Sequence, residues 1–532
     1  MKFSKKNIKD NLEIGVIISS VTLLIMFVIL MILKPSDTIE GISALFNMLI
    51  KYLGPVFQVV FFLTFIVAVY LGIGKYGNIK MGNSKPKYSM FSYISMMLLA
   101  SLASAALYWS FTEWAYYYQT PGLGLVPMSA KALEASLGYQ FFHWGMTNQA
   151  VYTIMGIAIA YAVYVKKVKS YQTSAVCCEM MGDKVSGKAK KWIGKMIDFC
   201  VVFGILGGLG SSLGLAIPMF AAGLHKITGW EVTPLMQISI LLVLAVVYTI
   251  MSYVGIDKGM KLVSNTTSVV TILFLGFIFI VGPTSFILKN IVNSMGFMLN
   301  NIPQMSLFTD PILNTGFPET WTIYFEAFYL NYVAMMGIFI AKISEGRTIR
   351  EISAATLLGI SAGGWLLFGI NGSYAIKMNF SKIVNVVGQI NSGSGDNAIY
   401  DILETLPLGT IVLPIIILLL IIGFVAPSLD SASLALSETV TKKGEPKKSI
   451  RIFWCVLLAV MPMTIILTNN KFDAIKQLSV IVSVPFLFIL IWMERGLLKW
   501  LKEDFNNKNT DTENCDKETK DCSKVKENDC MQ

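Results

Sequence analysis

Long apolar runs alternate with short polar segments along almost the whole chain. An α-helix needs about 20 apolar residues to cross the hydrocarbon core of a bilayer. Runs of this kind lie near residues 14–33, 52–73, 89–111, 141–165, 194–222, 236–254, 262–282, 321–341, 352–376, 409–437, 452–468 and 474–499. The pattern therefore predicts an all-α, polytopic membrane protein with twelve transmembrane helices.

Composition and motifs narrow the class of protein further. The 532 residues are 54% hydrophobic and 14% charged, whereas a soluble protein carries roughly 25% charged residues. The sequence contains no Walker A motif, no HExxH and no nucleophile elbow. We therefore expect neither an enzyme nor a cofactor, and any transport would be passive or driven by gradients.

Basic residues are concentrated in alternate loops between the predicted helices. These loops contain residues 2–9, 75–87, 166–195, 258–261, 342–350 and 442–451, and the opposite loops hold only one or two basic residues each. Cytoplasmic loops of membrane proteins carry such an excess of Lys and Arg. The asymmetry predicts a plasma-membrane protein with both termini in the cytoplasm. It also accounts for the net charge of +10 without a nucleic-acid partner.

The chain divides into six predicted parts. They are a cytoplasmic N-terminus (1–13), two peripheral transmembrane helices (14–88), a first five-helix repeat (89–282, helices 3–7), an external loop with an amphipathic helix at Ile287–Leu299 (283–320), a second five-helix repeat (321–499, helices 8–12) and a charged cytoplasmic tail (500–532). The composition of the tail predicts disorder. The spacing of its three cysteines matches no standard zinc pattern, so we expect no metal.

Polar interruptions in helices three and eight support the division into repeats. The interrupted stretches are Ala100–Tyr118 and Trp321–Glu351, five helices apart. Many transporters consist of two inverted repeats whose first helices are broken near the middle of the bilayer, where the substrate binds. These two stretches are therefore the first candidates for a binding site.

Helix eight presents an aromatic face. Phe325, Phe328, Tyr329 and Tyr332 occur at i, i+3, i+4 and i+7 and so share one side of the helix. Such a face can hold a cation without hydrogen-bond donors through the ring quadrupoles. By pattern alone, packing against neighbouring helices is the commoner role.

Other side chains in helices three and four extend this candidate site. Trp109, Glu113 and Tyr116 share a face of helix three, with Glu113 near the end of its apolar segment and only partly desolvated. In helix four, Trp144 and Tyr152 lie two turns apart. His143, near the start of helix four, is expected at the membrane edge as an interfacial residue.

Several polar side chains are predicted inside the membrane. Glu326 is either a neutral, structural acid or a residue that handles substrate or protons, since a carboxyl at that depth is costly. Asn331, which is polar but uncharged, likewise has either a structural role or a role in handling substrate. Oxygens that could ligate a cation are present at Ser211, Ser212, Ser428 and Asp430. Serine hydroxyls, however, readily bond back to a helix carbonyl.

Several long motifs resemble the betaine/carnitine/choline transporter family. They occur in matching order: LYWSFTEWAYYYQTPG (Leu107–Gly122), FHWG (Phe142–Gly145), SSLGLA (Ser211–Ala216), FTDP (Phe308–Pro311), Trp321-Thr322 and FIAKISEGRTIRE (Phe339–Glu351). The resemblance spans roughly residues 10–500. It implies a LeuT-type fold of ten core helices in two inverted repeats, two additional N-terminal helices, and assembly as a homotrimer in membrane lipid.

Within that family, the chain is most similar to sodium-independent carnitine/γ-butyrobetaine exchangers. The resemblance places an aromatic box for the substrate ammonium at Tyr116, Trp144, Phe328, Tyr329 and Tyr332, and an outer site at Trp109. Sodium-coupled relatives have a Gly-x-Gly-x-Gly run where this chain has residues 103–106 without glycine. Met336 matches a methionine whose sulfur takes the place of one sodium ion, and Gly208 stands where those relatives tend to have threonine.

Other positions depart from the exchangers. Thr267 stands where they have an arginine in place of the second sodium ion, and Ser428 of that sodium site is retained next to Pro427. Aromatic residues are replaced by Gln149 and Glu326, and a tryptophan pair by Phe328 and Tyr329. Arginines of the basic turn are replaced by Lys342 and Glu345. We therefore treat Tyr152, Gln149 and Glu326 as auxiliary site residues, and Met336, Ser212 and Ser428 as substitutes or remnants of ion sites.

The leading hypothesis is a secondary transporter of a small betaine-like zwitterion with a quaternary ammonium group, working by sodium-independent exchange. A sodium-coupled betaine symporter is the first alternative. The polarity of Gln149, Glu326 and Asn331 leaves a second one open, a transporter of a smaller amino acid such as glycine. A third is an osmotic sensor that uses the charged tail.

Overall fold

The computed structural model describes residues 11–467 and 472–529, and the part of the chain that it describes is mostly helical. Two isolated bridges, Leu12 with Thr441 and Lys80 with Thr348, are the extended pairings within these ranges. The helices are α2 (Ile14–Leu33), α3 (Pro35–Ile73), α4 (Met90–Leu102), α5 (Ala105–Gln119), α6 (Ala130–His143), α7 (Met146–Tyr164), α8 (Thr173–Met180), η1 (Gly182–Lys184), α9 (Gly187–Thr228), α10 (Pro234–Val254), η2 (Ile256–Met260), α11 (Lys261–Val281), α12 (Thr284–Ser306), η3 (Pro318–Thr322), α13 (Ile323–Ile343), α14 (Ile349–Ser353), η4 (Ala354–Ile360), α15 (Ser361–Phe380), α16 (Val386–Asn391), α17 (Gly395–Glu404), α18 (Val412–Val440), α19 (Lys448–Leu458), α20 (Val460–Leu467) and α21 (Phe472–Asp529).

All twelve predicted segments coincide with helices, but the count of twelve membrane spans is not confirmed. Among the described residues, nine helices are long and apolar enough to cross a bilayer, or ten when the bent pair α4 and α5 counts as one. The two other segments, 141–165 and 452–468, fall on helices that are interrupted. The first is divided at Trp144–Gly145 between α6 and α7, and the second at Ala459 between α19 and α20.

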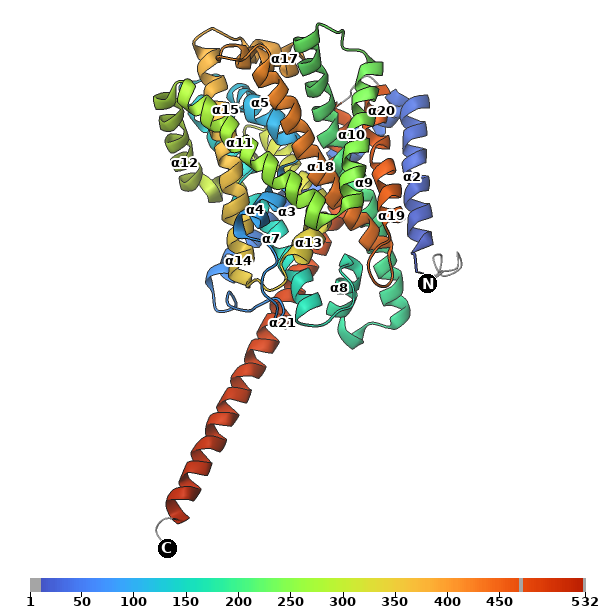
Figure 1. Ribbon diagram of the computed structural model, residues 1–532, viewed down its shortest axis with the longest axis vertical. Coiled ribbons are helices and arrows are strands. Elements are labelled where there is room, and N and C mark those ends of the chain that lie inside the picture. The colour runs from blue at the N-terminus through green and yellow to red at the C-terminus, as the bar shows by residue number, and fades with distance from the viewer. Residues whose placement is uncertain (1–10, 468–471, 530–532) are drawn as a thin grey trace.

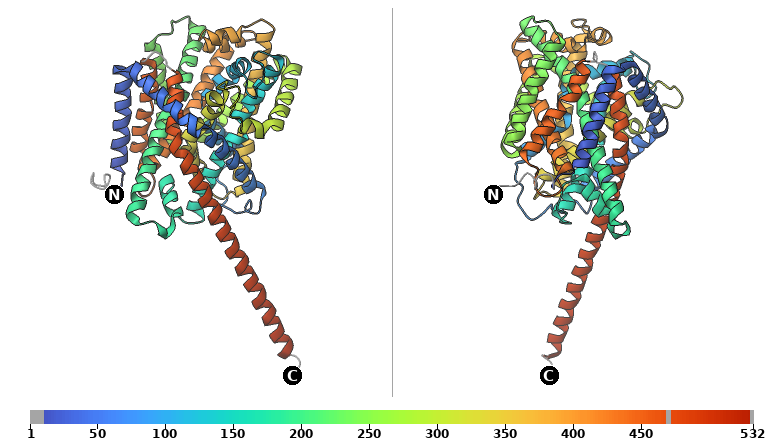
Figure 2. Two further views of the ribbon diagram at one scale, coloured as in Figure 1. Left: turned by 180° about the vertical axis from the view of Figure 1, so that it is seen from behind. Right: turned by 90° about the vertical axis from the view of Figure 1, so that its right-hand side faces the viewer.

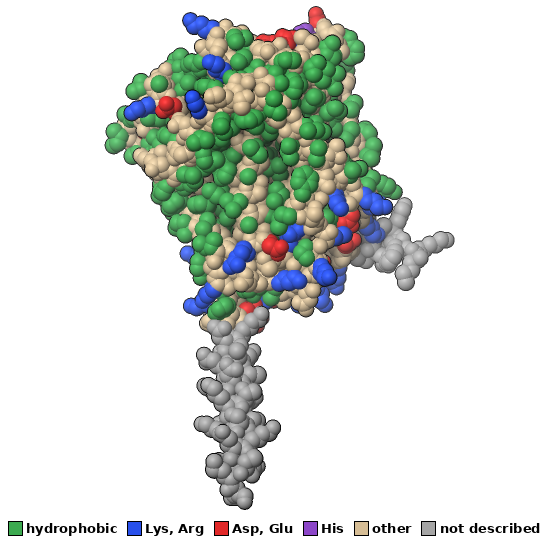
Figure 3. Space-filling view, turned by 60° about the vertical axis from the view of Figure 1, so that its left-hand side comes forward, with side chains coloured by type: hydrophobic (Ala, Val, Ile, Leu, Met, Phe, Trp, Pro, Cys, Tyr) green, Lys and Arg blue, Asp and Glu red, His purple; other side chains and the backbone are tan. Residues whose placement is uncertain are grey.

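The helix α13 lies at the centre of the bundle (Figures 1 and 2). Its span is completely buried and packs against α7, α9, α18 and α21. In the predicted peripheral helices α2 and α3, by contrast, only 22% and 39% of the most apolar window is buried. Apolar side chains cover the middle of the molecule, and basic side chains gather at the end where α21 leaves it (Figure 3). This distribution matches a lipid-facing belt with more basic side chains at one rim than at the other.

The predicted break in helix three is present between α4 and α5. The two helices are bent by 62°, and Ala103 at the bend has a φ of +50°. Helix eight differs from the prediction, because α13 is continuous from Ile323 to Ile343 and begins with the π-helical turn η3. Its single glycine, Gly337, packs closely against Met155 of α7 and does not interrupt the hydrogen-bond ladder.

The predicted amphipathic segment of the external loop forms the 23-residue helix α12, which packs against α6 and α15. The disorder expected of the tail from its composition stays a prediction. The backbone of α21 continues as one helix to Asp529 (Figure 1). Asp504 accepts hydrogen bonds from the Tyr161 hydroxyl and from Lys166 Nζ, which hold the first tail residues to α7. Side chains beyond residue 507, including the tail cysteines, lie outside the described residues.

Candidate functional site

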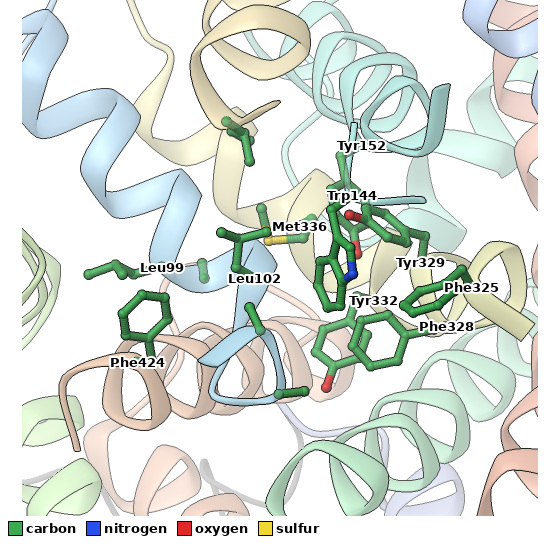
Figure 4. Close-up of a cluster of buried hydrophobic side chains, with 14 of the residues drawn as sticks. Leu99, Leu102, Trp144, Tyr152, Phe325, Phe328, Tyr329, Tyr332, Met336 and Phe424 are labelled. Atoms are coloured by element: carbon green, nitrogen blue, oxygen red, sulfur yellow. The ribbon is translucent and has the colours of Figure 1, made fainter. Parts of the chain in front are cut away.

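Trp144 and four rings of α13 form an aromatic box at the centre of the bundle (Figure 4). The ring centroid of Trp144 lies 5.3 Å from that of Phe325, 6.1 Å from Phe328 and 6.4 Å from Tyr329. Phe328 in turn lies 4.8 Å from Tyr332. All five side chains are at most 3% exposed. The structure therefore brings four of the predicted box residues together, with Phe325 as a fifth ring, in a closed arrangement.

The position of Trp144 depends on the break between α6 and α7. A Cβ on Gly145 would lie 2.2 Å from the carbonyl oxygen of Phe141, so only glycine permits this bend. The same carbonyl accepts a hydrogen bond from Trp365 Nε1 at 2.9 Å. The bend turns the Trp144 ring toward α13, where it also stacks on Phe368 of α15 at 5.0 Å.

A buried carboxyl group orients Trp144. Glu113 Oε2 accepts a hydrogen bond from Trp144 Nε1 at 2.8 Å, and Glu113 Oε1 accepts one from the Tyr117 hydroxyl at 2.5 Å. The same hydroxyl lies 2.7 Å from Nδ1 of His143, whose Nε2 lies 3.2 Å from Thr322 Oγ1. Glu113 and His143 are both fully buried. Their predicted places, partly desolvated and at the membrane edge, are therefore wrong, because the apolar run alone does not show how deeply neighbouring helices cover them.

Polar side chains support the far side of the box. Gln149 Nε2 donates to the Tyr329 hydroxyl at 3.1 Å and Gln149 Oε1 accepts from Ser101 at 3.2 Å. Tyr152 stacks on Tyr329 with centroids 5.1 Å apart. Tyr152 and Gln149, two of the auxiliary residues, thus hold Tyr329 in place.

The third auxiliary residue, Glu326, lies on another face of α13. One residue of an α-helix turns by about 100°, which directs Glu326 away from the side of Phe325. It is 2% exposed, and its Oε2 has no hydrogen-bond partner among the described residues. Asn331 is explained by packing, since its Nδ2 donates to the carbonyl and the hydroxyl oxygens of Ser479 in α21.

Tyr116 belongs to a second aromatic cluster near the box. Its ring centroid lies 5.8 Å from Trp109 and 5.2 Å from Trp321. Trp109 and Trp321 are themselves 5.9 Å apart. We call these three residues the outer cluster. Tyr116 thus contacts Trp109 of the predicted outer site.

The candidate ion-site residues are buried in three helices. Met336 is completely buried in α13, and Ser212 of α9 is 3% exposed. The Ser428 hydroxyl of α18 donates back to the carbonyl oxygen of Val425 at 3.0 Å. In α9, a Cβ on Gly208 would lie only 2.8 Å from Asn331 Cβ. A threonine at that position therefore cannot be accommodated without separating α9 from α13. The side chain of Ser211 lies outside the described residues.

Thr267, which the resemblance matches to the second sodium position, lies at the contact between α11 and α18. Thr267 packs against Gly423, where a Cβ would lie 2.2 Å from Thr267 Oγ1. Asp430 forms a buried ion pair with Arg451 of α19. Asp430 is thus engaged with a cation of the protein itself.

The basic turn after α13 closes one end of the bundle. Lys342 Nζ lies 2.5 Å from Glu438 of α18, and both side chains are largely buried. Arg347 donates to the carbonyl oxygen of Tyr88 at 2.7 Å. Thr348 and Glu351 form a reciprocal N-terminal cap on α14. The turn therefore fastens α13 to α18 and to the loop before α4.

The fold is that of a multi-pass membrane protein, and the family whose model the chain matches consists of transporters, not enzymes. Residues 15–506 match the model of the BCCT, betaine/carnitine/choline family transporters. The chain is 35% identical to a carnitine transporter of Acinetobacter baumannii over 448 residues, which cover 84% of this chain and 80% of the relative. It is 34% identical to the uncharacterized transporter YeaV of Escherichia coli K12 over 443 residues, or 82% and 91% of the two chains. The chain therefore belongs to the betaine/carnitine/choline transporter family.

A solved structure of a Na⁺-coupled sialic acid symporter, in a substrate-bound outward-open state, is also similar. The TM-score is 0.46 at 11% sequence identity, and the match covers 83% of this chain and 86% of that one.

The structure adds residues that sequence reasoning did not assign to the site. Phe325 was visible in the aromatic stripe, and Trp321 opens the same stretch of sequence. Phe368, Tyr324 and Lys476 carry no local signal, since they reach the site from α15, from another face of α13 and from α21. Only the tertiary fold brings them there.

Proposed function

We propose that this protein is a secondary transporter of a small zwitterion with a quaternary ammonium group, such as glycine betaine or carnitine, across the plasma membrane. The observation that carries the proposal is the buried box of Trp144, Phe328, Tyr329 and Tyr332. A quaternary ammonium cannot donate hydrogen bonds, so ring faces are the groups that bind it best, at about 0.5–2 kcal/mol per ring. Similarity to a carnitine transporter supports the same class of substrate.

The substrate carboxylate would bind at the bend between α4 and α5. Ser104 begins α5 without a side-chain cap, so backbone N–H groups near residues 104–106 remain as donors at the positive end of a helix dipole. Helix starts of this kind bind anions. The substrate would thus bridge the box and the bend, with its two charges at different helices.

Sodium-independent exchange is the proposed coupling mode. Gly208 leaves no space for a threonine ligand, and Met336 supplies an apolar thioether where a cation would need oxygen. Transport would then proceed by alternating access, in which the closed box opens to one side at a time. The basic end, where α2 starts and α21 leaves the bundle (Figure 1), would face the cytoplasm. A homotrimer is proposed from the family resemblance.

Uptake into proteoliposomes tests this proposal. Labelled betaine, carnitine and glycine are each offered to vesicles loaded with unlabelled betaine or with buffer, with and without a sodium gradient. Exchange predicts uptake only into loaded vesicles, at equal rates in sodium and potassium buffers. Strict dependence on a sodium gradient would establish symport instead.

The same assay decides between betaine-like substrates and small amino acids. The side-chain amide of Gln149, the residue that could favour a primary amine, is already hydrogen-bonded to Tyr329 and Ser101. We therefore expect excess glycine to leave betaine uptake unchanged. A tail-truncated variant with unchanged uptake at low and high salt would exclude the role of an osmotic sensor.

A further inference from the structure

The ammonium group of Lys476 lies among the aromatic rings of the site. Lys476 is in the first part of α21, and its Nζ is 4.4 Å from the centroid of Trp321 and 4.5 Å from that of Tyr324. Both rings are less than 5% exposed. Two such contacts to one ammonium form the kind of site that binds a quaternary ammonium. The protein therefore holds a cation of its own on the rings.

These two rings join the outer cluster to the box. Trp321 contacts Trp109 and Tyr116, at 5.9 and 5.2 Å. Tyr324 contacts Phe328 of the box, at 6.4 Å. Lys476 thus contacts one ring of the outer cluster and one ring that borders the box.

The charges around Lys476 act differently on a cationic substrate and on a zwitterionic one. Glu113 interacts electrostatically with Lys476, but its two oxygens already accept hydrogen bonds from Trp144 and Tyr117. A bare cation meets the repulsion of the Lys476 ammonium and competes with it for the rings. A zwitterion meets the same competition, but its carboxylate can pair with the displaced ammonium.

We propose that Lys476 is a specificity-determining residue that selects zwitterions over bare quaternary ammonium cations. On its way to the box, the substrate ammonium displaces the Lys476 ammonium from Trp321 and Tyr324, and the substrate carboxylate pairs with Lys476 before it reaches the bend between α4 and α5. This inference rests on the proposed function, because it requires a quaternary ammonium substrate at the aromatic site. It adds the rule by which betaine is accepted and choline, which has the same ammonium but no carboxylate, is rejected.

The test measures competition in proteoliposomes with the full-length protein. The selectivity is the ratio of the choline concentration to the betaine concentration that halves uptake of labelled betaine. Lys476→Met keeps the length of the side chain and removes its charge, so we expect this ratio to fall by at least about tenfold. Lys476→Arg keeps the charge and should retain most of the selectivity. Lys448→Met is the matched control, because Lys448 makes a similar contact at 4.0 Å with the exposed Tyr253, and its ratio should not change.

The possible results separate the two proposals. An unchanged ratio in Lys476→Met, with wild-type uptake of betaine, would overturn the role of Lys476 and leave the proposed function intact. Wild-type protein that neither takes up nor binds betaine or carnitine would contradict the proposed function itself. If Lys476→Met does not insert or fold, the wild-type ratio decides, since equal competition by choline and betaine would also overturn the inference.

Discussion

The hydrogen bond from Trp144 to Glu113 is predicted to set the affinity of the box, although Glu113 does not itself contact the ammonium. Glu113→Leu removes both acceptor oxygens, those of Trp144 Nε1 and of the Tyr117 hydroxyl. Tyr117 retains His143 as a neighbour at 2.7 Å, so Trp144 is the side chain more exposed to the loss.

The magnitude follows from the burial of this pair. A buried donor left without its partner costs about 1–3 kcal/mol. If that cost falls on the bound state, in which the Trp144 ring must be held in place, the Kd for betaine rises by roughly 5- to 150-fold. Trp144→Phe removes the N–H group while it retains a ring, and should weaken binding to a similar degree.

A double-mutant cycle tests the mechanism. Kd for betaine is measured by titration of the purified protein for the wild type, both single variants and the double variant. Since Glu113 acts through Trp144, Glu113→Leu in the Trp144→Phe background should change Kd by less than about threefold. An effect of equal size in both backgrounds would refute the reasoning and assign Glu113 an independent role.

Three further predictions concern stability, each measured as the unfolding temperature of purified protein. Gly208→Thr should be destabilised by about 1–3 kcal/mol, since its Cβ would lie 2.8 Å from Asn331 Cβ, and should gain no sodium dependence; sodium-stimulated uptake would contradict this. Lys342→Met should cost about 3–5 kcal/mol because it leaves Glu438 buried and unpaired, and Lys342→Met with Glu438→Leu should recover much of the loss; an unaltered single variant would contradict it. Burial raises the pKa of Asp396, in α17 outside the spans, from 3.8 to about 7. A raised carboxyl pKa means that the folded state binds more protons, so this contribution to stability is lost as pH rises from about 4 through 7; Asp396→Asn should remove that loss, and an identical pH profile would contradict the assignment.

The apolar pattern was sufficient to locate the helices, because a buried or lipid-facing helix must be apolar over its whole length. It did not give the number of spans. α6 and α7 divide at Gly145, where the absence of a Cβ permits the bend, and no count of apolar residues contains that information. The polar interruption at Ala100–Tyr118 did predict the break at Ala103, where the backbone takes a φ of +50°.

The site was predictable on α13 and less so elsewhere. A stripe at i, i+3, i+4 and i+7 places Phe325, Phe328, Tyr329 and Tyr332 on one face whatever the rest of the fold does. Residues on one face of α5 contact different parts of the site. Tyr116 packs against Trp321, whereas Glu113 accepts a hydrogen bond from Trp144. Lys476 comes from more than 150 residues later in the chain, so no local pattern could place it beside Trp321.

The most direct test of the central claim compares two ligands of the same shape. Glycine betaine and 3,3-dimethylbutanoate differ only by the replacement of the quaternary nitrogen with carbon, so both fill the box and both present a carboxylate. Binding of each to the purified protein is measured by calorimetric titration in sodium-free buffer. Four ring contacts at about 0.5 kcal/mol or more each predict that betaine binds at least about 30-fold more tightly. Equal affinities would show that the rings of Trp144, Phe328, Tyr329 and Tyr332 recognise shape and not charge, and would contradict the account.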